Sequence, residues 1–134
     1  MAVCEGNGDP FATLDRLTRL IDKSLVAIQR VDRVAPRYRF LEPVRHFAVA
    51  RCAAAGEAAA LRERHLDWFL GLAERAVPSL LHGADQARSL ASLEADHANL
   101  LAALEACDTA VGGATLALRL AGAAWLFWYI RGHF

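Results

Sequence analysis

One run of fifteen residues constrains this chain more than any other: Arg37-Tyr-Arg-Phe-Leu-Glu-Pro-Val-Arg-His-Phe-Ala-Val-Ala-Arg51. Its first part alternates arginine and aromatic side chains from Arg37 to Phe40, which is the period-two pattern of a β-strand. Pro43 follows at once and suits the first turn of a helix. The run therefore predicts a strand that passes into a helix with no loop between them.

The residues before this run supply a helix and a first strand. Asp9-Pro10 is a helix start, because the Asp side chain caps free amides and proline suits the first turn. The segment from Ser24 to Val31 is rich in aliphatic and β-branched residues and predicts a strand. Asp32–Pro36 is the expected turn, and Tyr38–Leu41 the returning strand.

After Gly56, which is expected to cap the preceding helix, the pattern is wholly helical. One helix is predicted from Glu57 to Val77, where Pro78 would end it. A second is predicted from about Asp85 to Cys107, and a third begins after Gly112-Gly113. The predicted fold is mainly α with one small β-hairpin.

Helix, two-stranded wing and helix form the second half of a winged-helix domain. We expect residues 1–56 to be this C-terminal half, and residues 57–134 to be a helical connector that enters a superhelical array. A winged helix needs further helices before its recognition helix, and few residues precede Asp9, so both ends of the chain look cut.

Charge, cysteine content and hydropathy limit the partners and the cellular compartment that can be expected for this chain. Residues 1–56 carry nine Lys+Arg against six Asp+Glu, a net +3, and residues 57–134 carry six against nine, a net −3. The basic excess is small for a nucleic-acid footprint. Three widely spaced cysteines and no signal-peptide pattern favour a reducing cytoplasm. The apolar run Leu120–Ile130 is shorter than the roughly 20 residues that cross a bilayer, so no membrane contact is expected.

Both halves resemble the region that follows the nucleotide-binding module in STAND-class (NB-ARC-like) regulatory ATPases, particularly those of bacterial LuxR-family and SARP-family transcriptional regulators. The first half carries the resemblance in Ala2-Val-Cys4, Leu17, Leu20-Ile-Asp-Lys-Ser-Leu-Val26 and Tyr38-Arg-Phe-Leu-Glu-Pro-Val-Arg45. The second half carries it in His65, Trp68-Phe69, Leu72-Ala-Glu74, Leu93-Glu94, Asp96-His97, Asn99-Leu100, Ala121-Gly-Ala-Ala-Trp125 and Tyr129-Ile-Arg-Gly-His133.

The resemblance implies a switch element. In such proteins the winged helix closes over bound nucleotide, and a histidine of a Met-His-Asp motif touches the ADP phosphate. Here that position reads Leu41-Glu42-Pro43, and these residues with Arg45 are the expected contacts to the nucleotide module. A carboxylate at Glu42 would repel phosphate unless an arginine or Mg²⁺ intervened. The alternative is that Glu42 favours the helix dipole in the first turn.

The resemblance also implies the partners and cofactors. The second half would lead into a tetratricopeptide-like (TPR-like) array, so the partners are the nucleotide-binding and repeat domains of the parent chain, with DNA read by a separate domain. ATP or ADP is implied for the parent protein, whereas this segment alone is expected to bind no cofactor.

Direct DNA binding is the main alternative. The helix before the wing carries Arg16, Arg19 and Lys23, and the returning strand carries Arg37 and Arg39. Phosphate contact by these side chains is physically reasonable. Asp15 and other acidic residues are interspersed among them.

A third possibility is a stand-alone helical interaction module. It predicts no exposed aromatic face, whereas a cut fragment predicts that Trp125, Trp128 and Phe134 are partly exposed and that the chain self-associates.

Catalytic and metal-binding patterns are weak. There is no Walker A glycine loop, no GxSxG elbow and no HExxH pair. Glu94-x-x-His97 has the spacing of di-iron bundles, but no second pair accompanies it. We therefore expect no catalytic residues, no metal site and no enzyme activity.

Overall fold

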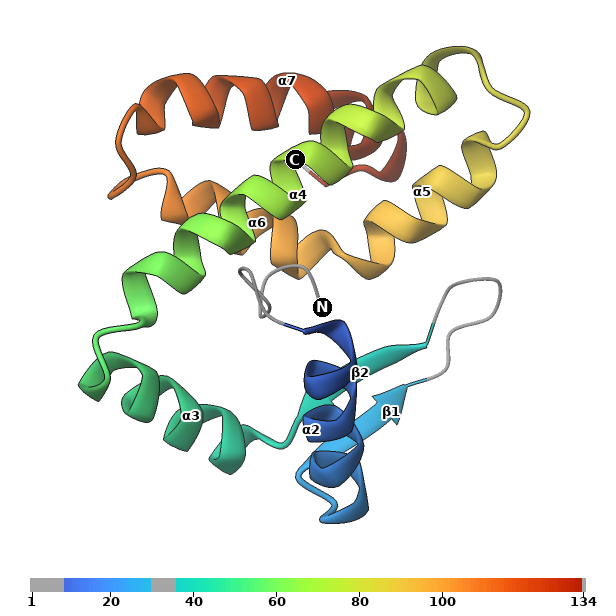
Figure 1. The fold of residues 1–134 in the computed structure, drawn as a ribbon. Helices are drawn as coiled ribbons and strands as arrows, with labels where there is room; N and C mark the ends of the chain where they lie inside the picture. Colours follow the sequence, from blue (N-terminus) through green and yellow to red (C-terminus); the bar gives the residue numbers. More distant parts are fainter. Residues whose placement is uncertain (1–8, 30–35, 134) are drawn as a thin grey trace. The chain divides into compact units, whose positions relative to one another are not determined.

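The computed structural model of this chain describes residues 9–29 and 36–133 (Figure 1). In chain order it contains α2 (Pro10–Asp22), β1 (Val26–Gln29), β2 (Arg37–Phe40), α3 (Glu42–Ala54), α4 (Ala58–His82), α5 (Gln86–Ala95), α6 (His97–Ala106) and α7 (Gly113–Arg131). The prediction of a mainly α fold with one small hairpin is confirmed.

The chain forms two compact units, Met1–Leu61 and Arg62–Phe134, which we call unit 1 and unit 2. The assignment of residues 1–56 to a winged-helix half and of residues 57–134 to a connector stays a prediction.

Helix α2 begins and ends through local backbone chemistry. At its start Oδ1 of Asp9 accepts a 3.0 Å hydrogen bond from the amide of Phe11, as a capping residue does. At its end Ser24 adopts a left-handed conformation (φ 56°), and the amides of Ser24 and Leu25 donate to the carbonyls of Ile21 and Leu20. This arrangement is a Schellman motif. The prediction that the first strand begins at Ser24 is therefore wrong, because Ser24 closes the helix and β1 starts at Val26.

The hairpin has the expected alternation. Val26 pairs with Phe40, Ile28 with Tyr38, and Ala27 with Arg39, in antiparallel register. Because side chains alternate along a strand, Val26, Ile28, Tyr38 and Phe40 share one face, and Ala27, Arg37 and Arg39 share the other. The returning strand begins one residue earlier than predicted and ends at Phe40 rather than at Leu41. Residues 30–31 of the predicted first strand and residues 32–35 of the turn lie outside the described residues.

Helix α3 follows β2 with Leu41 as its N-cap, so the strand passes into the helix as the sequence indicates. Gly56, at φ 72°, ends it: its own amide bonds to the Ala53 carbonyl and the amide of Glu57 to the Cys52 carbonyl. The expected glycine cap is confirmed. No residue of α3 is buried.

The core of the described chain lies in unit 2, where α4 to α7 each contribute apolar side chains. Its members are Leu66, Phe69, Leu70, Ala73, Leu80, Leu90, Leu93, Leu100, Ala103, Cys107, Leu120, Ala123 and Phe127. Burying one large apolar side chain stabilises a fold by about 1.5–3 kcal/mol. Among the described residues of unit 1, by contrast, only Val26 is fully buried, at 4% exposure.

Two predicted helix boundaries in unit 2 are wrong. Helix α4 does not end at Val77 but continues through Pro78 to His82. Proline removes one helical hydrogen bond, but Leu80 in the following turn is buried in the core, and its burial offsets that loss. The helix predicted from Asp85 to Cys107 is divided at Asp96, whose backbone (φ −103°, ψ 7°) leaves the helical region between α5 and α6.

Helix α7 begins at Gly113, as the glycine pair predicts. Gly112 is left-handed (φ 70°), and a side chain at Gly113 would overlap the carbonyl oxygen of Cys107. By length and composition α7 could cross a membrane. That is weak evidence, since a core helix passes the same test, and Leu120, Ala123, Ala124 and Phe127 of α7 are buried in the protein.

Candidate functional site

An apolar groove lies between α2 and the hairpin of unit 1. It has a volume of about 350 Å³ and is lined by Thr13, Arg16, Leu17, Leu20, Val26, Tyr38 and Phe40. The lining residues of the hairpin all come from the face that carries Val26 and Tyr38. This face therefore turns toward α2, and Arg37 and Arg39 lie on the opposite face of the hairpin.

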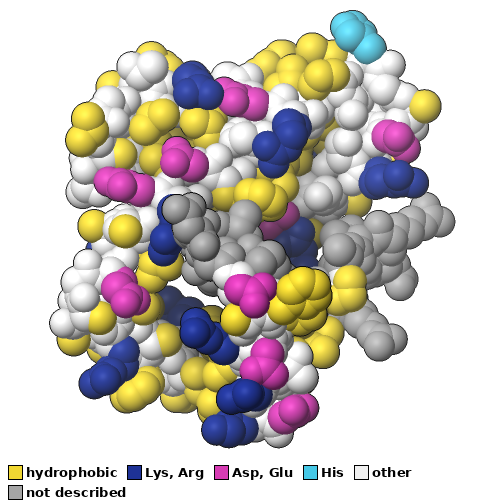
Figure 2. Space-filling view, viewed as in Figure 1, with side chains coloured by type: hydrophobic (Ala, Val, Ile, Leu, Met, Phe, Trp, Pro, Cys, Tyr) yellow, Lys and Arg dark blue, Asp and Glu magenta, His cyan; other side chains and the backbone are white. Residues whose placement is uncertain are grey.

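The five predicted phosphate contacts are consequently divided between two surfaces. Arg16, Arg19 and Lys23 lie on or at the end of α2, whereas Arg37 and Arg39 lie on the hairpin face that is turned away from it. Figure 2 shows basic side chains interspersed with acidic ones over α2, without a continuous basic patch. A protein that binds DNA through this unit would meet phosphates with the helix and the hairpin separately.

The five side chains also differ in their exposure and in their ion pairs. Arg19 Nη2 pairs with Oδ2 of Asp15 at 2.9 Å, and both side chains are exposed. Arg37 is half-buried and has its own contacts. Arg16, Lys23 and Arg39 are exposed, and no ion pair joins them to other residues in the described ranges. These three are the side chains best placed to contact an anion.

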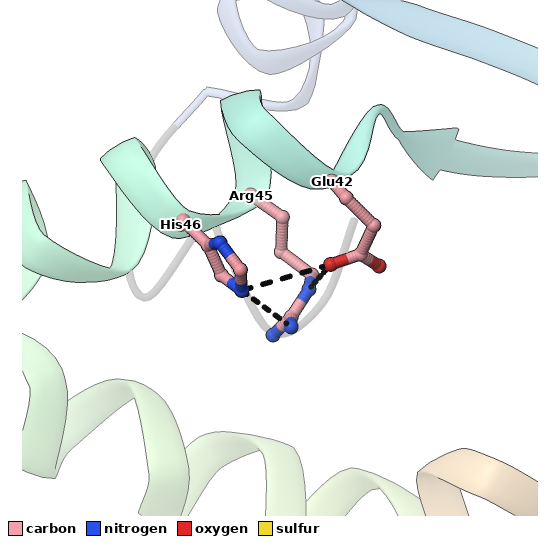
Figure 3. A network of polar contacts seen from close by, with 3 residues as sticks. All are labelled: Glu42, Arg45 and His46. Carbon is pink, nitrogen blue, oxygen red and sulfur yellow. Dashed lines mark hydrogen bonds and ion pairs between the residues drawn. The ribbon is translucent and has the colours of Figure 1, made fainter.

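The predicted nucleotide-module contacts gather at the N-terminus of α3 (Figure 3). Arg45 Nε donates a 3.0 Å hydrogen bond to Oε2 of Glu42. Nε2 of His46 lies 3.3 Å from Arg45 Nη2 and 3.8 Å from the same Glu42 oxygen. Leu41 and Pro43 flank this cluster and are exposed.

The contact between Arg45 and Glu42 bears on the repulsion that the sequence predicts between the Glu42 carboxylate and a phosphate. An arginine does stand beside the Glu42 carboxylate, so its charge is partly neutralised. The carboxylate also lies in the first turn of α3, where it favours the helix dipole. Whether any of these residues touches a nucleotide module stays a prediction. Sequence reasoning missed His46, although its position four residues after Glu42 places it on the same helical face.

A polar cluster joins α4 to α6 in unit 2. His65 of α4 forms a side-chain hydrogen bond with Asn99 of α6, and Asn99 Nδ2 donates to Oδ1 of Asp96 at 2.9 Å. Burial of the His65 ring lowers its pKa from the usual 6.5, against the opposing effects of the Asn99 hydrogen bond and the Asp96 charge. The ring also lies 4.5 Å from that of Phe69, between centroids. Its position within the fold suggests a structural role.

A second polar cluster forms where the chain turns back after α7. His133 Nε2 lies 3.2 Å from Oε1 of Glu94, and Arg131 Nε lies 3.4 Å from the other carboxylate oxygen. The His133 ring stacks on that of His97, with centroids 4.0 Å apart. Glu94 and His97 thus meet a third potential ligand, but the residues that the structure describes contain no group of three or more His, Cys, Asp or Glu side chains that could hold a metal ion.

The thiol of Cys107 is not an activated nucleophile. Burial raises the pKa of the Cys107 thiol, with a smaller contribution from Asp108, so it stays protonated near neutral pH. Cys107 Sγ donates to the Ala103 carbonyl at 3.4 Å. Cys52 is half-buried in α3.

In amino-acid sequence the chain is similar to proteins that are named as transcriptional regulators. It is 38% identical over 133 residues to proteins that carry the name "Putative HTH-type transcriptional regulator", one from Mycobacterium bovis and two from strains of Mycobacterium tuberculosis. The alignment covers 98% of this chain but only 14% of each relative. No protein-family model matches the chain, and no solved structure matches it significantly. Over nearly its whole length, the chain is therefore similar to one segment of mycobacterial HTH-type regulators.

Proposed function

We propose that this chain is a segment of a bacterial transcriptional regulator, and that it works through the winged-helix-like elements α2, β1, β2 and α3. The observation that carries the proposal is the 38% identity to HTH-type regulators, which extends over both units. The order of helix, hairpin and helix in unit 1 agrees with a winged helix. A regulator of this kind works in the cytoplasm, where bacterial DNA lies.

DNA contact is the first candidate for what unit 1 does, and the words "HTH-type" in the relatives' names favour it. Arg16 and Lys23 would contact phosphates from α2, and Arg39 would do so from the hairpin. Phosphate contacts of this kind supply affinity without sequence preference. Specificity would require side chains on α2 that reach base edges in the major groove.

The test is a fluorescence-anisotropy titration of labelled duplex DNA with the 134-residue chain at low salt. We expect binding that weakens when Arg16, Lys23 and Arg39 are all replaced by alanine. A matched control replaces Arg62, Arg75 and Arg88 of unit 2, which removes the same charge from another surface. Equal loss in both triple variants would mean that binding follows net charge alone and would count against unit 1.

Coupling between domains is the second candidate, and the exposed apolar surface of unit 1 favours it. Phe11, Leu14, Tyr38, Phe40, Leu41, Phe47 and Val49 are all exposed. Apolar side chains in such number fit contact with protein better than contact with DNA. On this reading, which follows the STAND-class resemblance, α3 would pack on a nucleotide-binding module through Leu41, Glu42, Pro43 and Arg45, and unit 2 would lead into a TPR-like array.

A reporter-gene assay with a full-length regulator that carries this segment separates the two candidates. Coupling predicts that Leu41→Asp or Phe47→Asp abolishes regulation, whereas the alanine triple variant at Arg16, Lys23 and Arg39 leaves it intact. DNA contact predicts that the triple variant is the damaging one. Circular dichroism of each variant confirms that it folds.

A further inference from the structure

We draw no further inference here: the strongest candidate, the apolar groove of about 350 Å³ between α2 and the hairpin of unit 1, carries none because nothing in the structure shows what covers it.

Discussion

Asn99 Nδ2 donates a 2.9 Å hydrogen bond to Oδ1 of Asp96, across the first turn of α6. Asp96 is 6% exposed and stands at the break between α5 and α6, where its amide bonds back to the Ser92 and Leu93 carbonyls. Because Asn99 also bonds His65 of α4, this pair ties the break to a neighbouring helix. The direction change between α5 and α6 is thereby anchored in the fold.

Removing the Asp96 carboxylate should destabilise unit 2. Asp96→Ala leaves the Asn99 amide without its acceptor in a half-buried site, and we expect a loss of about 1–3 kcal/mol in the free energy of unfolding. Urea denaturation followed by circular dichroism measures it. Asp108→Ala, an exposed carboxylate just after α6, is the control and should change stability little. Equal losses in both variants would contradict the role assigned to Asp96.

Stability should depend on pH through His65. Burial lowers the pKa of this imidazole below 6.5 in the folded chain, so between the two values the unfolded chain binds more protons. The stabilisation that neutral His65 provides is fully present above about pH 6.5. It is lost as the pH falls toward the pKa that His65 has in the folded chain. Denaturation at pH 7.5 and 5.5 should show a smaller pH difference for His65→Gln than for the wild type. An unchanged or larger difference would mean that His65 does not titrate in this way.

The bidentate ion pair between Glu74 of α4 and Arg119 of α7 should contribute only modestly to the free energy of unfolding. Arg119 Nε and Nη2 bond the two Glu74 carboxylate oxygens at 2.9 and 3.0 Å, but both side chains are about half exposed. Solvent screening limits such pairs to about 0.2–1 kcal/mol. A double-mutant cycle with Glu74→Ala and Arg119→Ala should give a coupling energy in that range, smaller at 0.5 M NaCl than at low salt. A coupling energy above about 2 kcal/mol, or one that does not change with salt, would contradict the claim that solvent and ions screen this ion pair.

Pro78→Ala should stabilise the chain. Alanine restores an amide that can donate to the Glu74 carbonyl one turn earlier, and proline in a helix interior costs about 3 kcal/mol relative to alanine. Because Pro78 is exposed, its replacement removes little packing. We expect a rise in midpoint temperature by thermal denaturation. A fall would mean that the fold needs the local geometry that Pro78 imposes.

Local signals predicted much of the fold. Asp9, Gly56 and Gly112 mark helix ends because each acts on backbone groups within a few residues, and the alternation from Arg37 to Phe40 determines which hairpin face is apolar. The errors lie where tertiary contacts decide. Pro78 does not end α4 because the next turn is buried, and the apolar seam through Leu93 and Leu100 continues across the Asp96 break.

The candidate site was less predictable for the same reason. Sequence spacing groups Arg16, Arg19, Lys23, Arg37 and Arg39, but the packing of α2 on one hairpin face separates the two strand arginines from the helix. The partial exposure predicted for Trp125 and Trp128 agrees with the structure, in which Trp125 is 55% exposed and Trp128 is partly buried against the core. Phe134 lies outside the described residues. The Glu42–Arg45 contact follows from helical spacing and could have been foreseen.

The salt dependence of DNA binding tests the central claim most directly. If Arg16, Lys23 and Arg39 each neutralise a phosphate, a plot of log affinity against log salt concentration should have a slope of roughly −3. Each single alanine substitution should then reduce the magnitude of the slope by about one. Absence of binding at low salt, or a slope that these substitutions leave unchanged, would contradict DNA contact by unit 1.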